Sequence, residues 1–358
     1  MAVRPNVVVV GAGIVGASIA WHLIRSGARV TVVEANNPGG IATRNSWAWI
    51  NASWGNPEAY FRLRVCAMNE WRRLERDLPN LRVAWTGSLN WELPTAKLEV
   101  FAAQHAAWGY DVRRVDRAEA QRIEPNLADP PDLAVHAPCE GAIEPLMVAR
   151  QLLSAARELG ATIIDNRTVQ SLDVCAGSVA GVETDSGRLD ADQVVVAAGA
   201  GTAALAATAG LALPVSVLPA LLIVTKPHGR LLNGLVMTPV MQLRQTADGR
   251  FVAAAIFSDA DFGDDGATAA ARLFSAIESL FSPMPSLAFD FHVVGRRPIP
   301  LDGFPLVGRA AGIDGLHVAV THSGVTLAPA IGRFVAEEIV TGRRDPLLAP
   351  FGLERLPK

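Results

Sequence analysis

A glycine-rich turn between an apolar strand and a helix constrains this chain more than any other feature. Residues 11–16 read Gly-Ala-Gly-Ile-Val-Gly, directly after the apolar run 6–10 and at the start of a predicted helix, 14–26. A second predicted strand, 29–33, is followed by Glu34, 21 residues after Gly13. This order of strand, glycine turn, helix, strand and acid is typical of a dinucleotide-binding βαβ unit. A merely tight turn would leave the acid unexplained.

Each glycine of the turn has its own physical role. Gly11 permits the tight turn, Gly13 lets the backbone approach a pyrophosphate, and Gly16 lets the helix pack against the strand. The pyrophosphate would then lie at the positive N-terminus of the helix. Glu34 can accept hydrogen bonds from a ribose diol and would repel a 2′-phosphate, so NADP is disfavoured. We expect the nucleotide to contact Gly11, Ala12, Gly13, Ile14, Val15, Gly16, Glu34 and Ala35.

A second, similar motif occurs at residues 199–204 (Gly-Ala-Gly-Thr-Ala-Ala), after the apolar run 194–198. No acidic residue lies about twenty positions further on, as the dinucleotide motif would require. We therefore interpret Ala198 and Gly199 as the end of a strand that lines the first nucleotide. A single dinucleotide site favours a bound cofactor that substrate reduces and that oxygen, a quinone or a partner protein reoxidises.

Composition matters here for the classes of protein that it excludes. The 358 residues are 50% hydrophobic, enough for about two domains with a sizeable core. A net charge of −3 gives no basic footprint for nucleic acid. Residues 194–225 carry no charge and could span a bilayer, but glycines and prolines interrupt them. We predict strand, turn, short helix and strand there, and no integral membrane span.

The three cysteines are far apart and form no Cys-x-x-Cys pair. They indicate neither a disulfide framework nor a zinc site, and they favour a cytoplasmic protein. No histidine clusters with acids at ligand spacing, so we expect no metal site.

Helices and strands alternate along the rest of the chain, so we predict an α/β protein whose nucleotide-binding domain is interrupted by a sheet-rich domain. The predicted helices are 58–78, 95–108, 117–124, 146–159, 267–280 and 325–340. The predicted strands are 82–91, 162–164, 221–224, 241–245, 251–257 and 317–321, with hairpin turns at 185–187 and 248–249. We predict turns over 125–138.

Three further segments carry a resemblance to a known family. Residues 39–44 read Gly-Gly-Ile-Ala-Thr-Arg, residues 295–305 hold Gly-Arg-Arg-Pro and Asp-Gly-Phe-Pro, and residues 321–329 read Thr-His-Ser-Gly-Val-Thr-Leu-Ala-Pro. Together with the glycine turn, these segments resemble the D-amino acid oxidase superfamily, to which glycine oxidase and sarcosine oxidase belong. The resemblance spans essentially the whole chain and is weakest over 216–291. It is specific for the superfamily and not for a substrate.

The resemblance implies a discontinuous Rossmann-like FAD-binding domain and an interleaved α+β substrate domain built on an antiparallel sheet. Residues 1–80, 141–215 and 295–358 would form the FAD-binding domain, and residues 81–140 and 216–294 the substrate domain. Carried over residue by residue, further FAD contacts fall on Thr43, Arg44, Asn45, Ser46, Val169, Gly324, Val325, Thr326 and Leu327. N–H groups of residues 324–326, which open the last helix, would stabilise negative charge growing on the flavin. Ser323 would at the same time be an ordinary helix cap.

In this family a carbon–nitrogen bond is oxidised by hydride transfer to flavin N5, and water hydrolyses the resulting imine. The pocket must orient the substrate, usually with an arginine on its carboxylate. Arg297 matches the position that glycine oxidase uses, with an arginine that bridges the two domains as the alternative. Arg244 is a second candidate. Where glycine oxidase has an arginine just before Gly324, this chain has His322, which could bind substrate or be a core histidine.

Residues 47–54 contain three tryptophans where the family has smaller side chains. They could form an aromatic wall for an apolar or cationic substrate, or they could wedge between the two domains. Trp49 is our candidate for the pocket.

Our first hypothesis is an FAD-dependent oxidoreductase that acts on a small amino acid or a secondary amine. One alternative is an FAD-dependent 2-hydroxy acid dehydrogenase. Another is the flavin-bearing subunit of a heteromeric amine or amino-acid dehydrogenase complex. The sequence leaves open the substrate, its stereochemistry, the electron acceptor, covalent attachment of FAD and the oligomeric state.

Overall fold

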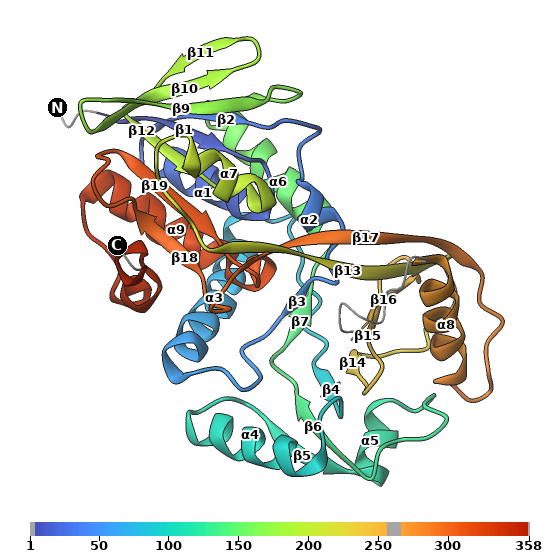
Figure 1. The fold of residues 1–358 in the computed structure, drawn as a ribbon. Coiled ribbons are helices and arrows are strands. Elements are labelled where there is room, and N and C mark those ends of the chain that lie inside the picture. Colours follow the sequence, from blue (N-terminus) through green and yellow to red (C-terminus); the bar gives the residue numbers. More distant parts are fainter. Residues whose placement is uncertain (1–3, 256–265, 357–358) are drawn as a thin grey trace.

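A six-stranded sheet forms one of the two large layers of the computed structural model, which describes residues 4–255 and 266–356 (Figure 1). The strand order is β18-β19-β12-β1-β2-β8. The strands span Asn6–Val10 (β1), Arg29–Val33 (β2), Thr162–Ile164 (β8), Gln193–Val196 (β12), Leu306–Arg309 (β18) and Leu316–Val320 (β19). All neighbours are parallel except β18, which runs antiparallel to β19 at the edge. The predicted βαβ unit is thus confirmed at the centre of a Rossmann-like sheet.

The alternation of side chains along β1 gives the sheet two separate apolar faces. Val7 and Val9 belong to a core shared with helices α1 (Ile14–Arg25), α3 (Glu58–Asp77), α6 (Pro145–Glu158) and α9 (Gly324–Thr341). Val8 and Val10 face a second core, shared with α7 (Thr202–Ala207) and a three-stranded sheet. That sheet consists of β9 (Val169–Cys175), β10 (Ser178–Thr184) and β11 (Gly187–Asp190). Because successive strand residues point to opposite faces, both layers can be fully apolar.

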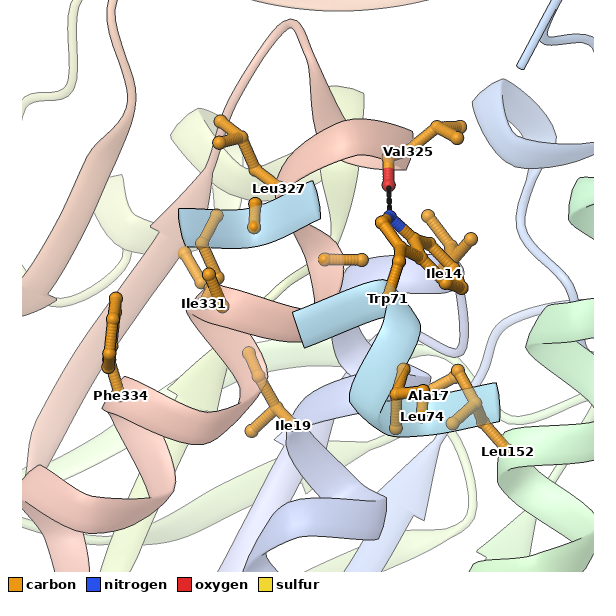
Figure 2. Packing of buried hydrophobic residues seen from close by; sticks show 14 of the residues in the cluster. Ile14, Ala17, Ile19, Trp71, Leu74, Leu152, Val325, Leu327, Ile331 and Phe334 are labelled. Atoms are coloured by element: carbon orange, nitrogen blue, oxygen red, sulfur yellow. Dashed lines mark hydrogen bonds between the residues drawn. The ribbon is translucent and has the colours of Figure 1, made fainter. Parts of the chain in front are cut away.

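The helical face is held together by close packing of α1, α3 and α9, which Figure 2 shows from nearby. Trp71 on α3 is fully buried, and its indole nitrogen donates to the carbonyl oxygens of Val325 and Thr326 at 3.1 Å each. A buried tryptophan usually needs such a partner for its N–H. The contact fixes the first turn of α9 against α3.

An eight-stranded sheet forms the other large layer, in the order β17-β13-β16-β15-β14-β4-β6-β5. Its strands are β4 (Ser88–Asn90), β5 (Arg113–Asp116), β6 (Leu133–Ala137), β13 (Val215–Thr225), β14 (Leu235–Met237), β15 (Met241–Gln245), β16 (Phe251–Ala255) and β17 (Phe289–Pro300). Helix α8 (Gly266–Ser279) contacts β13, β16 and β17, whereas α4 (Thr95–Ala107) and α5 (Arg117–Ile123) contact β5 and β6. The long pair β13 and β17 runs from this sheet toward the six-stranded one (Figure 1).

Several sequence predictions differ from the structure. Residues 125–138, predicted as turns, contain β6, and the long strand β17 was not predicted. Of the strand segment 82–91 only Ser88–Asn90 is a strand. The uncharged run 194–225 does form strand, turn, short helix and strand, and the described residues contain no helix long and apolar enough to cross a membrane. Residues 256 and 257 of the predicted strand 251–257 lie outside the described residues.

Strands from both predicted substrate-domain segments, 81–140 and 216–294, share the eight-stranded sheet. The predicted boundary between residues 294 and 295 falls inside β17, which pairs with β13 along its whole length. The division into an FAD-binding domain and a substrate domain stays a prediction.

Candidate FAD and substrate site

The glycine turn forms a close crossing of three backbone segments. Gly11 has a φ of +103°, and a Cβ on it would lie 2.5 Å from the carbonyl oxygen of Ala197. A Cβ on Gly16 would lie 2.0 Å from the carbonyl oxygen of Gly11. Neither position tolerates a side chain, so the start of α1 can come close to the ends of β1 and β12. The resulting bare backbone fits the phosphate-binding role predicted for it.

Glu34, at the end of β2, is buried and bonded to the turn that it follows. Its carboxylate accepts from the Ala12 N–H at 2.8 Å and from the Asn36 N–H at 3.0 Å. A carboxylate has about four lone-pair sites, so acceptor capacity remains for a ribose diol. A cavity of about 210 Å³ opens beside it, lined by Glu34, Asn36, Asn37, Gly40, Ile41 and Arg44.

The short helix α2 (Ile41–Arg44) closes over the start of α1. The Thr43 hydroxyl accepts from the Ile14 N–H at 3.0 Å, and a Cβ on Gly40 would lie 2.8 Å from Gly13 Cα. Arg44 is exposed, and its guanidinium donates to the carbonyl oxygens of Gly40 and Asn37. Thr43 and Arg44 therefore flank the helix end where the pyrophosphate is expected.

The remaining predicted nucleotide contacts lie around this turn, with one at a distance along the chain. Ala198 and Gly199 follow β12 next to Gly11, in a short 3-10 turn, Gly199–Gly201. Val169 opens β9, two residues after Arg167, whose N–H donates to the carbonyl oxygen of Glu34. Val15 lies beside the start of α9, where a Cβ added to Gly324 would be 3.4 Å from Val15 Cγ2.

The N-terminus of α9 is open. Among the described residues, the N–H groups of Gly324, Val325 and Thr326 have no acceptor, and Ser323 makes no side-chain cap. Within the part of the chain that the structure describes, the buried Thr321 hydroxyl has no hydrogen-bond partner. Orphaned donors of this kind are satisfied by water or by a ligand. The start of α1 lies nearby, because a Cβ on Gly324 would come 3.4 Å from Val15 Cγ2.

Arg297 and His322 lie close enough to interact beside this helix end. Arg297 is exposed on β17 and donates to the carbonyl oxygen of Pro219 at 3.2 Å. His322 keeps accessible surface, yet surrounding protein atoms desolvate it, and with Arg297 and Arg64 they lower its pKa to about 4. His322 is therefore neutral at pH 7, and the fixed positive charge there belongs to the arginines.

Arg244, the other candidate for binding a carboxylate, is buried and already has partners. Its guanidinium pairs with Glu144 at 2.7 Å, and its Nε donates to the carbonyl oxygen of Trp47 at 2.8 Å. This arrangement links β15 to the loop after α2 and to the start of α6. The guanidinium of Arg244 therefore already has partners on both of these segments.

The three tryptophans of residues 47–54 lie in different surroundings. Trp47 is buried, and its indole nitrogen donates to the carbonyl oxygen of Val252 on β16. Trp49 opens β3 (Trp49–Ile50), and its ring lies 5.5 Å from that of Trp47. Trp49 and Trp54 line a largely apolar cavity of about 750 Å³, with Leu93, Lys97, Val100 and Phe101. Trp47 thus packs against the eight-stranded sheet, whereas Trp49 is positioned for a pocket.

Two buried charged side chains that the sequence did not single out hold residues 49–53 in place. Glu140 is fully buried and accepts from Trp49 Nε1, Ser53 Oγ, Ser88 Oγ and Tyr110 Oη, all within 2.8 Å. Burial raises the pKa of this carboxyl, while the four hydrogen bonds lower it. On the other side, Arg64 of α3 binds the backbone and side chain of Asn51.

Asn45 and Ser46 complete the predicted contacts. Asn45 lies beside β17, where a Cβ on Gly295 would be 3.4 Å from the Asn45 Cβ. The Ser46 hydroxyl accepts from the Ala48 N–H. Leu327 is buried in the first turns of α9, and its N–H already binds Ser323.

Comparison with known proteins decides the family. Residues 6–338 match the family of FAD dependent oxidoreductases, DAO. The chain belongs to this family. It is therefore an FAD-dependent oxidoreductase, and the predicted superfamily, fold and cofactor are confirmed.

Individual relatives are similar over nearly their whole length. The chain is 29% identical to uncharacterized oxidoreductase YurR of Bacillus subtilis, over 96% of this chain and 97% of that protein. It is 25% identical to glycine oxidase of Bacillus licheniformis, over 94% and 93% respectively. Among solved structures, iminodiacetate oxidase from Chelativorans sp. BNC1 is 25% identical with a TM-score of 0.85, covering 97% of this chain and 98% of that one.

Proposed function

We propose that this oxidoreductase oxidises the C–N bond of a small amino acid or secondary amine, giving an imine that water hydrolyses. The observation that carries the proposal is the placement of Arg297 beside neutral His322 at the open N-terminus of α9. Bound FAD supplies the acceptor for the hydride that leaves the substrate carbon. The protein then has to bind the carboxylate, orient the C–H bond and stabilise negative charge near α9.

Arg297 is our candidate for the carboxylate. It lies two residues after Gly295 and so points to the same face of β17, the face that Asn45 covers. An arginine can bind a carboxylate through two parallel hydrogen bonds, which fixes the orientation of the substrate. Because His322 stays neutral, it can form a hydrogen bond with the substrate. It does not act as a second cation that would compete with Arg297 for the carboxylate.

Residues Trp49 and Trp54 are our candidates for the apolar part of the pocket. The Thr326 hydroxyl of α9 donates to the carbonyl oxygen of Trp49 at 2.9 Å. Trp49, which lines the cavity, is thus bonded directly to the helix end where the flavin is expected. An aromatic wall suits an apolar or cationic group through packing and cation–π contact.

The named relatives support an amine over a 2-hydroxy acid. One is named for glycine, a primary amine with a carboxylate, and the other for iminodiacetate, a secondary amine with two carboxylates. Both substrates carry the amino and carboxylate groups that Arg297 and the start of α9 would orient.

An anaerobic screen tests this function. The purified holoprotein is mixed with small amino acids, N-substituted amino acids and 2-hydroxy acids, and bleaching of the flavin absorbance near roughly 450 nm is followed. We expect bleaching by an amine together with release of ammonia or a primary amine. Bleaching by 2-hydroxy acids alone, with a ketone as the only product, would replace the proposal by the dehydrogenase alternative.

The electron acceptor is tested with the same reduced protein. Reoxidation by air indicates an oxidase, and reoxidation only by a quinone indicates a dehydrogenase. Failure of both with the isolated chain would favour the flavin-bearing subunit of a complex. Light scattering of the same sample gives the oligomeric state.

A further inference from the structure

We infer that Arg64 is a positioning residue that keeps the start of α9 open toward the flavin and adds a buried positive charge there. The inference rests on the proposed placement of the flavin at the N-terminus of α9. It concerns a residue of α3 that neither the glycine turn nor the family motifs include.

Arg64 is a buried cation with only neutral partners. The residue is 6% exposed, and its guanidinium donates to Asn51 O at 3.0 Å, Ser323 Oγ at 2.7 Å, Tyr60 Oη at 3.4 Å and Asn51 Oδ1. Within residues 4–255 and 266–356, no carboxylate forms an ion pair with it. A buried guanidinium without a counter-charge is costly, so stability alone gives no reason for it. An anion bound nearby would supply the missing negative charge.

The hydrogen bond to Ser323 has a direct consequence for α9. Ser323 occupies the N-cap position, where a serine side chain ordinarily accepts from the N–H groups of the first turn. Here its hydroxyl accepts from Arg64, and the N–H groups of residues 324–326 stay without an acceptor among the described residues. Arg64 therefore leaves the positive end of an 18-residue helix available to a ligand.

Asn51 forms a second link between Arg64 and the first turn of α9. Its backbone oxygen and its side-chain oxygen both accept from Arg64. The Oγ1 atom of Thr326 on α9 lies 3.4 Å from the Asn51 backbone nitrogen and 3.5 Å from Asn51 Oδ1. The positive charge of Arg64 also contributes to the lowered pKa of His322. Arg64 is thus held close to the helix end, and its charge is felt at the neighbouring side chain.

The affinity of the flavin for sulfite reports how well the surrounding protein stabilises negative charge on the flavin ring. Its sulfur lone pair forms an S–N5 bond with oxidised flavin, the electron pair displaced in the ring leaves negative charge at N1 and the C2 carbonyl, and no other oxidant or reductant takes part. We expect Arg64→Met to weaken sulfite binding at least about tenfold, because it removes both the charge and the contact to Ser323. Tenfold corresponds to a fall of about 30 mV in the two-electron potential, which dye-linked reduction can check.

Two further variants make the test specific. Arg62→Met removes a charge from the exposed side of the same helix and should leave sulfite affinity within twofold of wild type. Arg64→Lys keeps the charge but has no planar fork to hold Asn51 and Ser323 together, so we expect an affinity between wild type and Arg64→Met. Wild-type sulfite affinity and potential in flavin-loaded Arg64→Met overturn the inference.

Should Arg64→Met fail to fold or to retain FAD, Arg64→Lys decides alone: sulfite binding weakened at least threefold supports the inference, and unchanged binding overturns it. Sulfite needs no amine substrate. A negative substrate screen with wild-type sulfite behaviour intact would therefore count against the proposed substrate class and not against the role of Arg64.

Discussion

Arg296 and Arg297 are adjacent on β17 and therefore point to opposite faces of the strand. If Arg297 binds the substrate carboxylate, Arg297→Ala should lower kcat/KM for carboxylated substrates by roughly one to three orders of magnitude, the loss of a charge-assisted pair. Arg296→Ala is the matched control, with the same charge removed from the other face, and should stay near wild type. Steady-state kinetics with both variants decides. An unchanged kcat/KM in Arg297→Ala would remove this residue from the substrate site.

Glu140 allows a prediction about the wall of the substrate pocket. Glutamine has the same shape, but its amide group presents donors where Glu140 accepts from Trp49, Ser53, Ser88 and Tyr110. We expect Glu140→Gln to lower the free energy of unfolding by about 2 kcal/mol and to shift tryptophan emission to longer wavelength.

The control for Glu140 is Glu75→Gln. Glu75 accepts from the indole nitrogen of Trp85 at 2.7 Å, the same type of contact away from the proposed site. Urea denaturation and emission spectra measure both effects. If Glu140→Gln kept the wild-type free energy of unfolding and the wild-type emission, the four hydrogen bonds of Glu140 would not hold the pocket wall in place.

The buried roles of Arg64 and Glu140 could not be predicted from the sequence, because no local pattern marks them. Arg64 lies on a helix whose apolar periodicity was correctly predicted, but its burial comes from Asn51 and Ser323, 13 and 259 positions away. Glu140 likewise receives hydrogen bonds from side chains 30 to 91 positions away. Only motifs whose chemistry is local, such as the glycine turn with Glu34, could be predicted from order along the chain.

At the scale of the elements, helices α1 and α9 pack closely against each other at Gly332. A Cβ there would lie 2.2 Å from Ser18 Oγ and 2.8 Å from both the Ser18 backbone and the His22 ring. Gly332→Ala should therefore destabilise the protein by about 2–3 kcal/mol, although alanine favours helices by up to about 1 kcal/mol. Because both helix N-termini face the expected cofactor, FAD affinity should fall as well.

Thermal unfolding with and without added FAD measures both consequences of Gly332→Ala. Gly229→Ala serves as the control, since a Cβ there meets no atom within 4 Å. Equal melting temperatures for the two variants would show that the two helices can separate without cost.

Elements with strong local periodicity were predicted well, and those that depend on distant partners were not. Helix α3 and the βαβ unit agree with prediction within a residue or so. Strand β6 follows two prolines, and it becomes a strand by pairing with β4 and β5 on either side. Strand β17 contains Gly295 and two prolines, which usually disfavour a strand, and its pairing with β13 outweighs them.

For the molecule as a whole, the cofactor site is assembled from distant parts of the chain. The glycine turn, residues 40–44, the end of β12 and the start of α9 come together because β1 pairs with β12, and β12 with β19. The sequence predicted these pieces from motifs, whereas the substrate side depends also on β13 and β15, which lie where the resemblance is weakest. This explains why the cofactor was predictable and the substrate was not.

Buried histidines give the whole molecule a defined response to acid. His317 on β19 lies in the core, where burial and then Arg309 lower its pKa to about 4. In the unfolded chain its pKa is about 6.5, so below that pH the unfolded state binds a proton that the folded state does not. The free energy of unfolding therefore falls as the pH drops from 6.5 toward 4, by about 2 kcal/mol from this residue at pH 5.

His317→Gln should remove that share of the acid sensitivity. Between pH 7 and pH 5, its loss of unfolding free energy in urea should be smaller than the wild-type loss by about 2 kcal/mol. The exposed His292 supplies the control, because His292→Gln should retain the wild-type loss. Burial, and then Arg25, lower the pKa of His22 to about 3. His22 should therefore preserve part of the pH dependence of the unfolding free energy in both variants. If His317→Gln lost as much unfolding free energy between pH 7 and pH 5 as the wild type, His317 would bind its proton in the folded state too.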